Sequence, residues 1–160
     1  GQAVYDYPLA FTRLPVAKAL KSIQDSLKKE NLALKIYDAY RPYDVTLKFY
    51  NIVKDTNFVA TPWGGSRHNR GCAVDVSIID LNTGREIAMP TEFDDFSEKA
   101  NPTYSELPDS VLQNRSKLIS VMAHYGFTVY PTEWWHYDFQ GWENYELLDI
   151  PFDTLLIHSK

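Results

Sequence analysis

The stretch SRHNRGCAVDVSII, residues 66–79, decides the fold around which the rest of the chain is arranged. Glycine and proline recur over residues 61–71 and predict a loop there. β-Branched residues dominate from Cys72 to Ile79, which predicts a strand. We therefore expect a glycine-rich loop that leads directly into a strand of the core.

Asp75 lies in the middle of this predicted strand. Because alternate side chains of a strand share a face, Asp75 points the same way as Ala73 and Ser77, and the apolar residues point the other way. This pattern favours a strand whose back packs on the core while its front lines a site. A carboxylate in such a strand is costly unless it is paired or binds a metal. The alternative is a buried Asp75 that accepts hydrogen bonds from the loop amides.

The regions on both sides of this stretch contain further helices and strands. Three segments have apolar residues at helical spacing and predict helices: residues 15–29, 43–54 and 110–124. Three others predict strands: Leu32–Tyr37, Phe127–Tyr130 and Trp134–Phe139. Residues 90–108 are polar and are expected to be irregular. Since helices and strands do not alternate strictly, we expect an α+β fold, a small antiparallel sheet flanked by helices.

Composition excludes several classes of protein. The 160 residues fit a single domain, residues 1–160, and the net charge of −5 with dispersed lysine and arginine argues against a nucleic-acid partner. No apolar run is long enough for a membrane span. With Cys72 as the single cysteine, a metal must use histidine and carboxylate ligands. Because the sequence begins at Gly1, a periplasmic and a cytoplasmic location both stay open, as does the oligomeric state.

Two of the four histidines have informative neighbours. His68 lies in the glycine-rich loop, and His136 ends the motif Glu133-Trp134-Trp135-His136. Two imidazoles and a carboxylate suit catalytic Zn²⁺, which takes three protein ligands and leaves one position for water. The sequence therefore predicts one Zn²⁺ per chain, bound by His68, Asp75 and His136.

Glu133 is a candidate base for chemistry at that ion. A carboxylate beside the metal can take the proton of the bound water and pass it to the leaving amine. In a regular strand, residues three apart point to opposite faces, so Glu133 is expected at the loop end or on a bulge. The two tryptophans between Glu133 and His136 are typical of a core.

Together these motifs resemble the VanX-type D-alanyl-D-alanine dipeptidases, zinc D,D-peptidases that share their fold with the Hedgehog signalling domain. Three motifs match in the order of the family: residues 37–42 (YDAYRP), the pattern Ser-x-His-x-x-Gly-x-Ala-x-Asp at 66–75, and residues 133–136. The resemblance implies a bacterial enzyme of peptidoglycan metabolism that hydrolyses the free dipeptide D-alanyl-D-alanine to two D-alanines. It implies the zinc ligands named above, and Glu133 as general acid and base.

The resemblance also implies substrate contacts. Arg41 would stabilise the oxyanion of the tetrahedral intermediate, which suits its permanent charge. Residues 89–94 (MPTEFD) are similar to a Met-Gly-x-x-Phe-Asp segment whose Asp binds the substrate ammonium, a role for a buried Asp94, helped by Ser66. Pro90 departs from the usual glycine. Members of the group usually have an N-terminal arm before the position of Gly1, and this sequence does not include that arm.

Two other functions are compatible with the same residues. A D,D-carboxypeptidase or L,D-endopeptidase of this group would cut longer peptidoglycan peptides, but it has no free ammonium for Asp94 to hold. A non-catalytic zinc-binding module would bind cell-wall peptides or a protein partner, but it has no need of Glu133. We therefore expect a dipeptidase.

Overall fold

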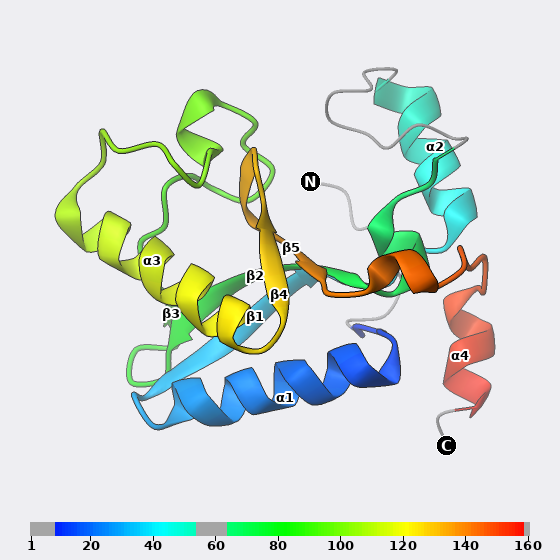
Figure 1. Cartoon of the computed structure of the whole chain (residues 1–160), viewed down its shortest axis with the longest axis horizontal. Helices are drawn as coiled ribbons and strands as arrows, with labels where there is room; N and C mark the ends of the chain where they lie inside the picture. The colour runs from blue at the N-terminus through cyan, green and yellow to red at the C-terminus, as the bar shows by residue number, and fades with distance from the viewer. Residues whose placement is uncertain (1–8, 54–63, 159–160) are drawn as a thin grey trace.

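The computed structural model describes residues 9–53 and 64–158. Its elements, in chain order, are α1 (Leu14–Lys28), β1 (Leu32–Asp38), α2 (Tyr43–Val53), the 3₁₀ helix η1 (Arg67–Arg70), β2 (Ala73–Asp80), β3 (Arg85–Glu86), the 3₁₀ helix η2 (Glu98–Ala100), α3 (Asp109–His124), β4 (Phe127–Tyr130), β5 (Glu133–Phe139), the 3₁₀ helix η3 (Trp142–Asn144) and α4 (Phe152–His158). Figure 1 shows helices flanking the sheet, so the α+β prediction is confirmed. Residue 54 of the second predicted helix and residues 61–63 of the predicted loop lie outside the described residues.

One antiparallel sheet organises these elements. Its strands follow the order β1-β2-β5-β4, and the short β3 pairs with the end of β2. Residues 73–75 of β2 pair with residues 136–138 of β5, which are distant in sequence. This pairing brings the two chemistry-bearing motifs to adjacent strands.

The core lies between the sheet and the helices α1 and α3. Pro15 stands in the first turn of α1, where its missing N–H costs nothing. One face of α1 is buried and joins the apolar residues of the sheet and of α3 in a single cluster: Val16, Leu20, Ile23, Leu27, Val74, Val76, Ile78, Leu118 and Met122. Burial of each large apolar side chain contributes roughly 1.5–3 kcal/mol, so this cluster holds the sheet in place.

The front of β2 is more enclosed than the sequence predicts. Ala73 and Ser77 are fully buried, and Asp75 is only 4% exposed. The cause is that other segments cover this face, because His68 of η1 lies against Asp75 and Tyr37 lies next to Ser77. The site on this face is therefore a buried cluster and not an open strand surface.

The register between β4 and β5 is interrupted beside Glu133. Val129 pairs with Tyr137, but the next residue, Tyr130, pairs with Glu133. The extra residues on β5 form a bulge, so Glu133 and His136 do not follow the alternation of a regular strand. The expected displacement of Glu133 is confirmed.

The C-terminal helix α4, which was not predicted from the sequence, lies at the same end of the molecule as α2 (Figure 1). The hydroxyl of Tyr40 donates to the carbonyl of Ile150 at 3.2 Å and accepts its N–H at 2.8 Å. The ring of Phe152 contacts those of Phe11 and Tyr40.

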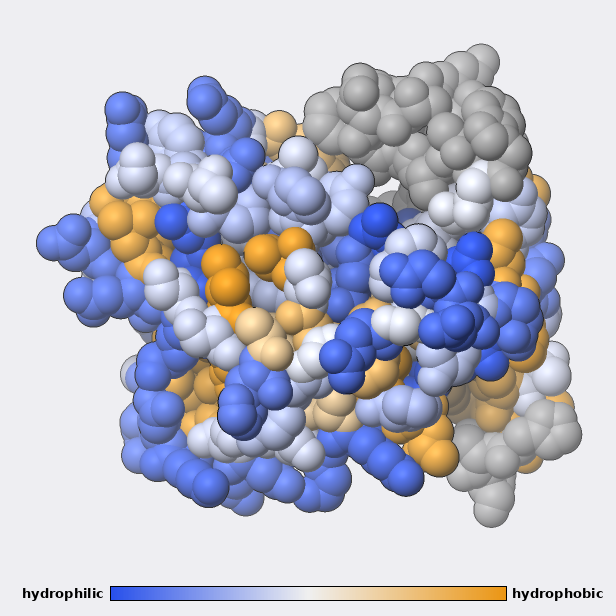
Figure 2. Space-filling model, viewed as in Figure 1, coloured by the Kyte–Doolittle hydropathy of each residue, from blue (hydrophilic) through white to orange (hydrophobic). Residues whose placement is uncertain are grey.

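In Figure 2, hydrophobic side chains form small patches between hydrophilic ones. No helix within residues 9–53 and 64–158 combines the length and apolar character needed to cross a bilayer.

Candidate metal centre

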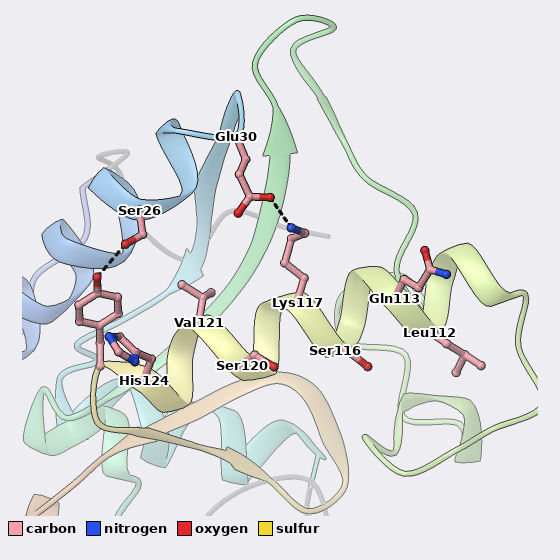
Figure 3. Close-up of a pocket in the computed structure, with 10 residues that line it drawn as sticks. Ser26, Glu30, Leu112, Gln113, Ser116, Lys117, Ser120, Val121 and His124 are labelled. Carbon is pink, nitrogen blue, oxygen red and sulfur yellow. Dashed lines mark hydrogen bonds and ion pairs between the residues drawn. The ribbon is translucent and has the colours of Figure 1, made fainter.

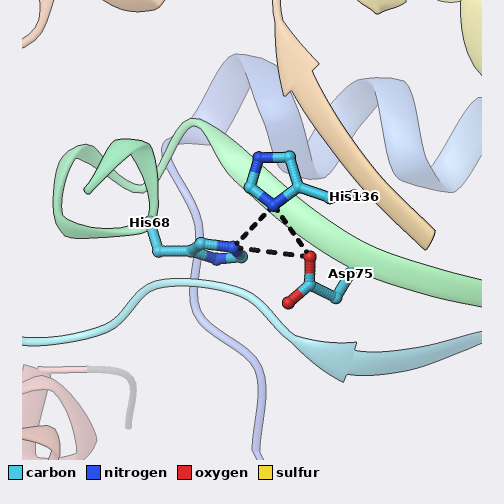
Figure 4. Close-up of side chains that lie close together, drawn as sticks. All are labelled: His68, Asp75 and His136. Carbon is cyan, nitrogen blue, oxygen red and sulfur yellow. Dashed lines mark hydrogen bonds and ion pairs between the residues drawn. The ribbon is translucent and has the colours of Figure 1, made fainter. Parts of the chain in front are cut away.

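The three predicted ligands meet in one cluster (Figure 4). His68 comes from η1, while Asp75 and His136 are direct partners in the β2–β5 ladder. Nδ1 of His136 lies 3.0 Å from Oδ1 of Asp75 and 3.2 Å from Nε2 of His68. That Nε2 lies 3.5 Å from the same carboxylate oxygen. Ligands about 2.1 Å from a tetrahedral metal are roughly 3.4 Å apart, so the three atoms have the spacing of ligands to one ion.

The second nitrogen of each imidazole has a partner that assigns its proton. Nδ1–H of His68 donates to the carbonyl of Ala39 at 2.6 Å, so Nε2 directs a lone pair into the cluster. Nε2–H of His136 donates to Oδ1 of Asp138 at 3.0 Å, so Nδ1 directs a lone pair inward too. When both imidazoles are neutral, as they are in a metal site, their two lone pairs converge with a carboxylate oxygen of Asp75. A cation would satisfy all three at once.

Oδ1 of Asp75 is the atom that most needs this cation. It is buried and has no hydrogen-bond donor among the described residues. Burial alone would raise the pKa of Asp75, but the adjacent imidazoles outweigh burial and hold the pKa well below its usual range. Burial lowers the pKa of His136, but Asp138 and Asp75 outweigh it and raise the pKa to about 10. The cluster therefore attracts positive charge, and its donor set fits a divalent metal ion.

The loop that carries His68 is held by hydrogen bonds. Oγ of Ser66 accepts the amide N–H of His68 at 3.2 Å, and the amide N–H of Ser66 donates to Oδ1 of Asn69 at 2.7 Å. Asn69 is fully buried, and its Nδ2 donates to the carbonyl of Arg41 and to Oγ1 of Thr46, both at 2.8 Å. The Ser66 hydroxyl thus holds the ligand loop, and its contact with substrate stays a prediction.

Glu133 lies within electrostatic range of the three ligands. Its carboxylate interacts electrostatically with His136, Asp75 and His68. Burial raises the pKa of Glu133, and the attraction of the two imidazoles does not cancel this rise. A carboxylate with a raised pKa is a stronger base, which suits a group that accepts a proton near neutral pH.

The loop of residues 91–96 brings Asp94 to the same cluster. The ring of Phe93 stacks on Tyr37 with centroids 4.3 Å apart and meets Trp135 edge-on at 5.7 Å. Nε1–H of Trp134 donates to Oγ1 of Thr91 at 2.9 Å. The two tryptophans are core residues, as expected, and they also hold the Asp94 loop against β5.

Asp94 itself is exposed, so the prediction of a buried carboxylate is wrong. The reason is that Phe93, and not Asp94, fills the space beside Tyr37 and Trp135. Enough protein still surrounds the carboxyl to raise its pKa to about 6, first by desolvation and then through the negative charge of Asp75. Asp94 is therefore close enough to the ligand cluster to interact with it.

Arg41 has a partner in its own segment. Its Nε donates to Oδ2 of Asp38 at 3.0 Å, and its Nη2 forms an ion pair with the same oxygen. Its amide N–H donates to the carbonyl of His68 at 3.1 Å, which ties this segment to the ligand loop. The guanidinium also lowers the pKa of Asp94. Arg41 thus lies at the edge of the cluster, and its oxyanion role stays a prediction.

Three polar residues at this site were missed in the sequence analysis: Asn69, Asp138 and Arg67. Asp138 is 8% exposed, and its carboxylate joins the imidazole of His136 to the guanidinium of Arg67. One signal was available, because Asp138 follows His136 by two residues in a strand and therefore shares its face.

A shallow groove lies apart from this cluster (Figure 3). It has a volume of ≈ 690 Å³ and runs along α3 beside the end of α1. A hydrogen bond joins the hydroxyls of Ser26 and Tyr125 across the groove. An ion pair joins Glu30 and Lys117. None of the predicted site residues lines it.

Comparison with known proteins identifies the family. The family model Peptidase_M15, described as D-ala-D-ala dipeptidase, matches residues 1–151. The chain belongs to this family. The D-alanyl-D-alanine dipeptidase of Escherichia coli (strain K12) is 28% identical over 156 residues, which cover 98% of this chain and 80% of that protein.

Two solved structures share the fold. VanYB in complex with D-alanine-D-alanine has a TM-score of 0.53 and 17% identity, over 89% of this chain and 82% of that one. A vancomycin-resistance D,D-pentapeptidase VanY in complex with Zn(II) has a TM-score of 0.50 and 18% identity, over 89% and 83%. At these identities the likeness concerns the fold alone, and it confirms the predicted D,D-peptidase-like architecture.

Proposed function

We propose that this chain is a zinc-dependent dipeptidase that hydrolyses free D-alanyl-D-alanine to two D-alanines in bacterial peptidoglycan metabolism. The observation that carries the proposal is the convergence of three lone pairs, from His68, Asp75 and His136, in a chain of the D-ala-D-ala dipeptidase family. We assign one Zn²⁺ per chain, because two imidazoles and a carboxylate leave a fourth tetrahedral position open. When bound, the ion lowers the pKa of a water molecule and polarises the scissile carbonyl.

Glu133 accepts the proton of the attacking water and then donates it to the leaving amine. Its electrostatic interaction with the three ligands and its raised pKa support this role. Arg41 stabilises the negative charge that develops on the carbonyl oxygen, since a guanidinium stays charged and offers several donors. Its charge already acts on Asp94, which supports a place at the edge of the reacting centre.

Asp94 binds the ammonium of the dipeptide, with help from the hydroxyl of Ser66. An exposed carboxylate near the ligand cluster suits a substrate that arrives from solvent with a charged amine. This contact restricts the enzyme to free dipeptides, because an acylated amine leaves the carboxylate without its partner.

The direct test is release of D-alanine from D-alanyl-D-alanine. Protein stripped with a chelator should release none, and one equivalent of Zn²⁺ per chain should restore turnover. Asp75→Asn is the matched variant, because it keeps the size of the ligand and removes its charge, and it should need far more zinc for the same turnover. No release of D-alanine by the zinc-loaded native protein would refute the proposal and favour a non-catalytic zinc-binding module.

A D,D-carboxypeptidase acting on longer peptides is the second candidate, since a solved D,D-pentapeptidase shares the fold. The two candidates differ in kcat/KM for the free dipeptide, its N-acetyl form and a pentapeptide stem. A dipeptidase should cleave the free dipeptide far better than the other two. Comparable cleavage of the pentapeptide would favour the carboxypeptidase.

A further inference from the structure

A chain of polar groups runs from His136 away from the ligand cluster. Oδ1 of Asp138 accepts Nε2–H of His136 at 3.0 Å, and Oδ2 of Asp138 forms an ion pair with Arg67. The guanidinium carbon of Arg67 lies 4.6 Å from the ring centroid of Trp142 and 5.4 Å from that of Tyr130. Two aromatic rings and a carboxylate therefore hold this guanidinium.

The two histidines of the cluster are held by different groups. Nδ1–H of His68 donates to a neutral carbonyl, that of Ala39, whereas Nε2–H of His136 donates to a carboxylate. A carboxylate makes an imidazole a stronger metal ligand and fixes its orientation. The side chain of Asp138 is only 11% exposed, so its charge needs compensation, which Arg67 supplies.

We propose that Asp138 and Arg67 are a positioning pair for the metal. Asp138 holds the ring of His136 with Nδ1 toward the ion, and Arg67 holds Asp138. A half-turn of the ring about Cβ–Cγ would place the carbon Cδ2 where Nδ1 faces the ion, and the hydrogen bond from Nε2–H to Asp138 opposes this turn. The proposal rests on the proposed metal site, but not on the substrate or the reaction.

Zinc affinity, measured by competition with a chelator, tests the pair without any activity assay. Asp138→Asn keeps an oxygen that accepts Nε2–H but removes the charge, and it should weaken zinc binding about 10-fold. Asp138→Ala removes the acceptor as well and should weaken it toward about 100-fold. The visible spectrum of the Co²⁺-loaded variants should also shift, since the ligand ring is no longer fixed. Glu30→Gln is the matched control, because it removes a carboxylate from the remote Lys117 ion pair and should keep the native affinity.

A double-mutant cycle tests whether Arg67 acts through Asp138. Arg67→Met should weaken zinc binding, and the double variant with Asp138→Asn should bind zinc no more weakly than Asp138→Asn alone. Native zinc affinity in Asp138→Asn, with only the melting temperature of the metal-free protein lowered, would make the pair merely structural and overturn the proposal. Should Asp138→Asn fail to fold, Arg67→Met alone decides, and native zinc affinity in that variant would overturn the proposal equally.

Discussion

Adding zinc to the metal-free protein should raise its thermal stability by an amount that follows from the cluster. The three ligands come from η1, β2 and β5, which separate on unfolding, so the ion binds the native chain and not the unfolded one. Their spacing of 3.0 to 3.5 Å already suits a tetrahedral ion, so little binding energy is lost to rearrangement. At free zinc of about 1,000 times Kd, the free energy of unfolding should rise by about 4 kcal/mol.

For a chain of this size, about 1 kcal/mol shifts Tm by roughly 2–4 °C, so the expected rise is about 8–16 °C. The assay is a pair of calorimetric melts, on chelator-treated and on zinc-loaded protein, with Kd measured separately. His68→Ala and His136→Ala each remove one ligand and should lose most of the rise. An equal rise in the native protein and in both variants would refute the assigned site, as would no rise in the native protein.

Three further outcomes are expected. Glu133→Gln should keep stoichiometric zinc and lose turnover by roughly 10²–10⁴-fold, and near-native kcat would exclude Glu133 as the base. KM for D-alanyl-D-alanine should rise as pH falls through the pKa of Asp94, about 6 or lower once a cation is bound, because protonation removes the charge that holds the ammonium. In Asp94→Asn this pH dependence of KM should vanish, and the preference for the free dipeptide over its N-acetyl form should become smaller. If KM depends on pH in Asp94→Asn as it does in the native protein, the contact between Asp94 and the substrate ammonium is wrong. Asn69→Ala leaves three groups without their partner, of which the Thr46 hydroxyl belongs to a fully buried residue, and should lower the free energy of unfolding by about 3 kcal/mol in denaturant titrations. A loss below about 1 kcal/mol would show that water replaces the amide.

The local elements were predictable because one pattern dominates each of them. Helical spacing of apolar residues marks α1, observed as Leu14–Lys28, and β-branched residues mark β2, observed as Ala73–Asp80. The bulge beside Glu133 also followed from the sequence, since an alternating strand cannot present Glu133 and His136 to one face. These conclusions need only neighbouring residues.

What the sequence could not predict depends on contacts between distant segments. Asp138 reaches Arg67 only because η1 lies against β5, and no local pattern encodes that approach. Whether Asp94 is exposed was decided by Phe93, which fits between two aromatic rings contributed by other strands. The role of Asn69 could not be predicted either. In the sequence it is an ordinary loop asparagine, and its three hydrogen bonds, to Ser66, Arg41 and Thr46, appear only in the folded chain.

The direct pairing of Asp75 with His136 has a consequence for folding. A slip of β5 by one residue against β2 would turn the imidazole of His136 to the opposite face of the sheet, away from Asp75. A chain misaligned in this way cannot chelate the ion, so zinc stabilises only the correctly aligned sheet. Zinc supplied during refolding would therefore shift the population from misaligned chains to chains with the native pairing. The metal would then select the correct strand register before it takes part in any reaction.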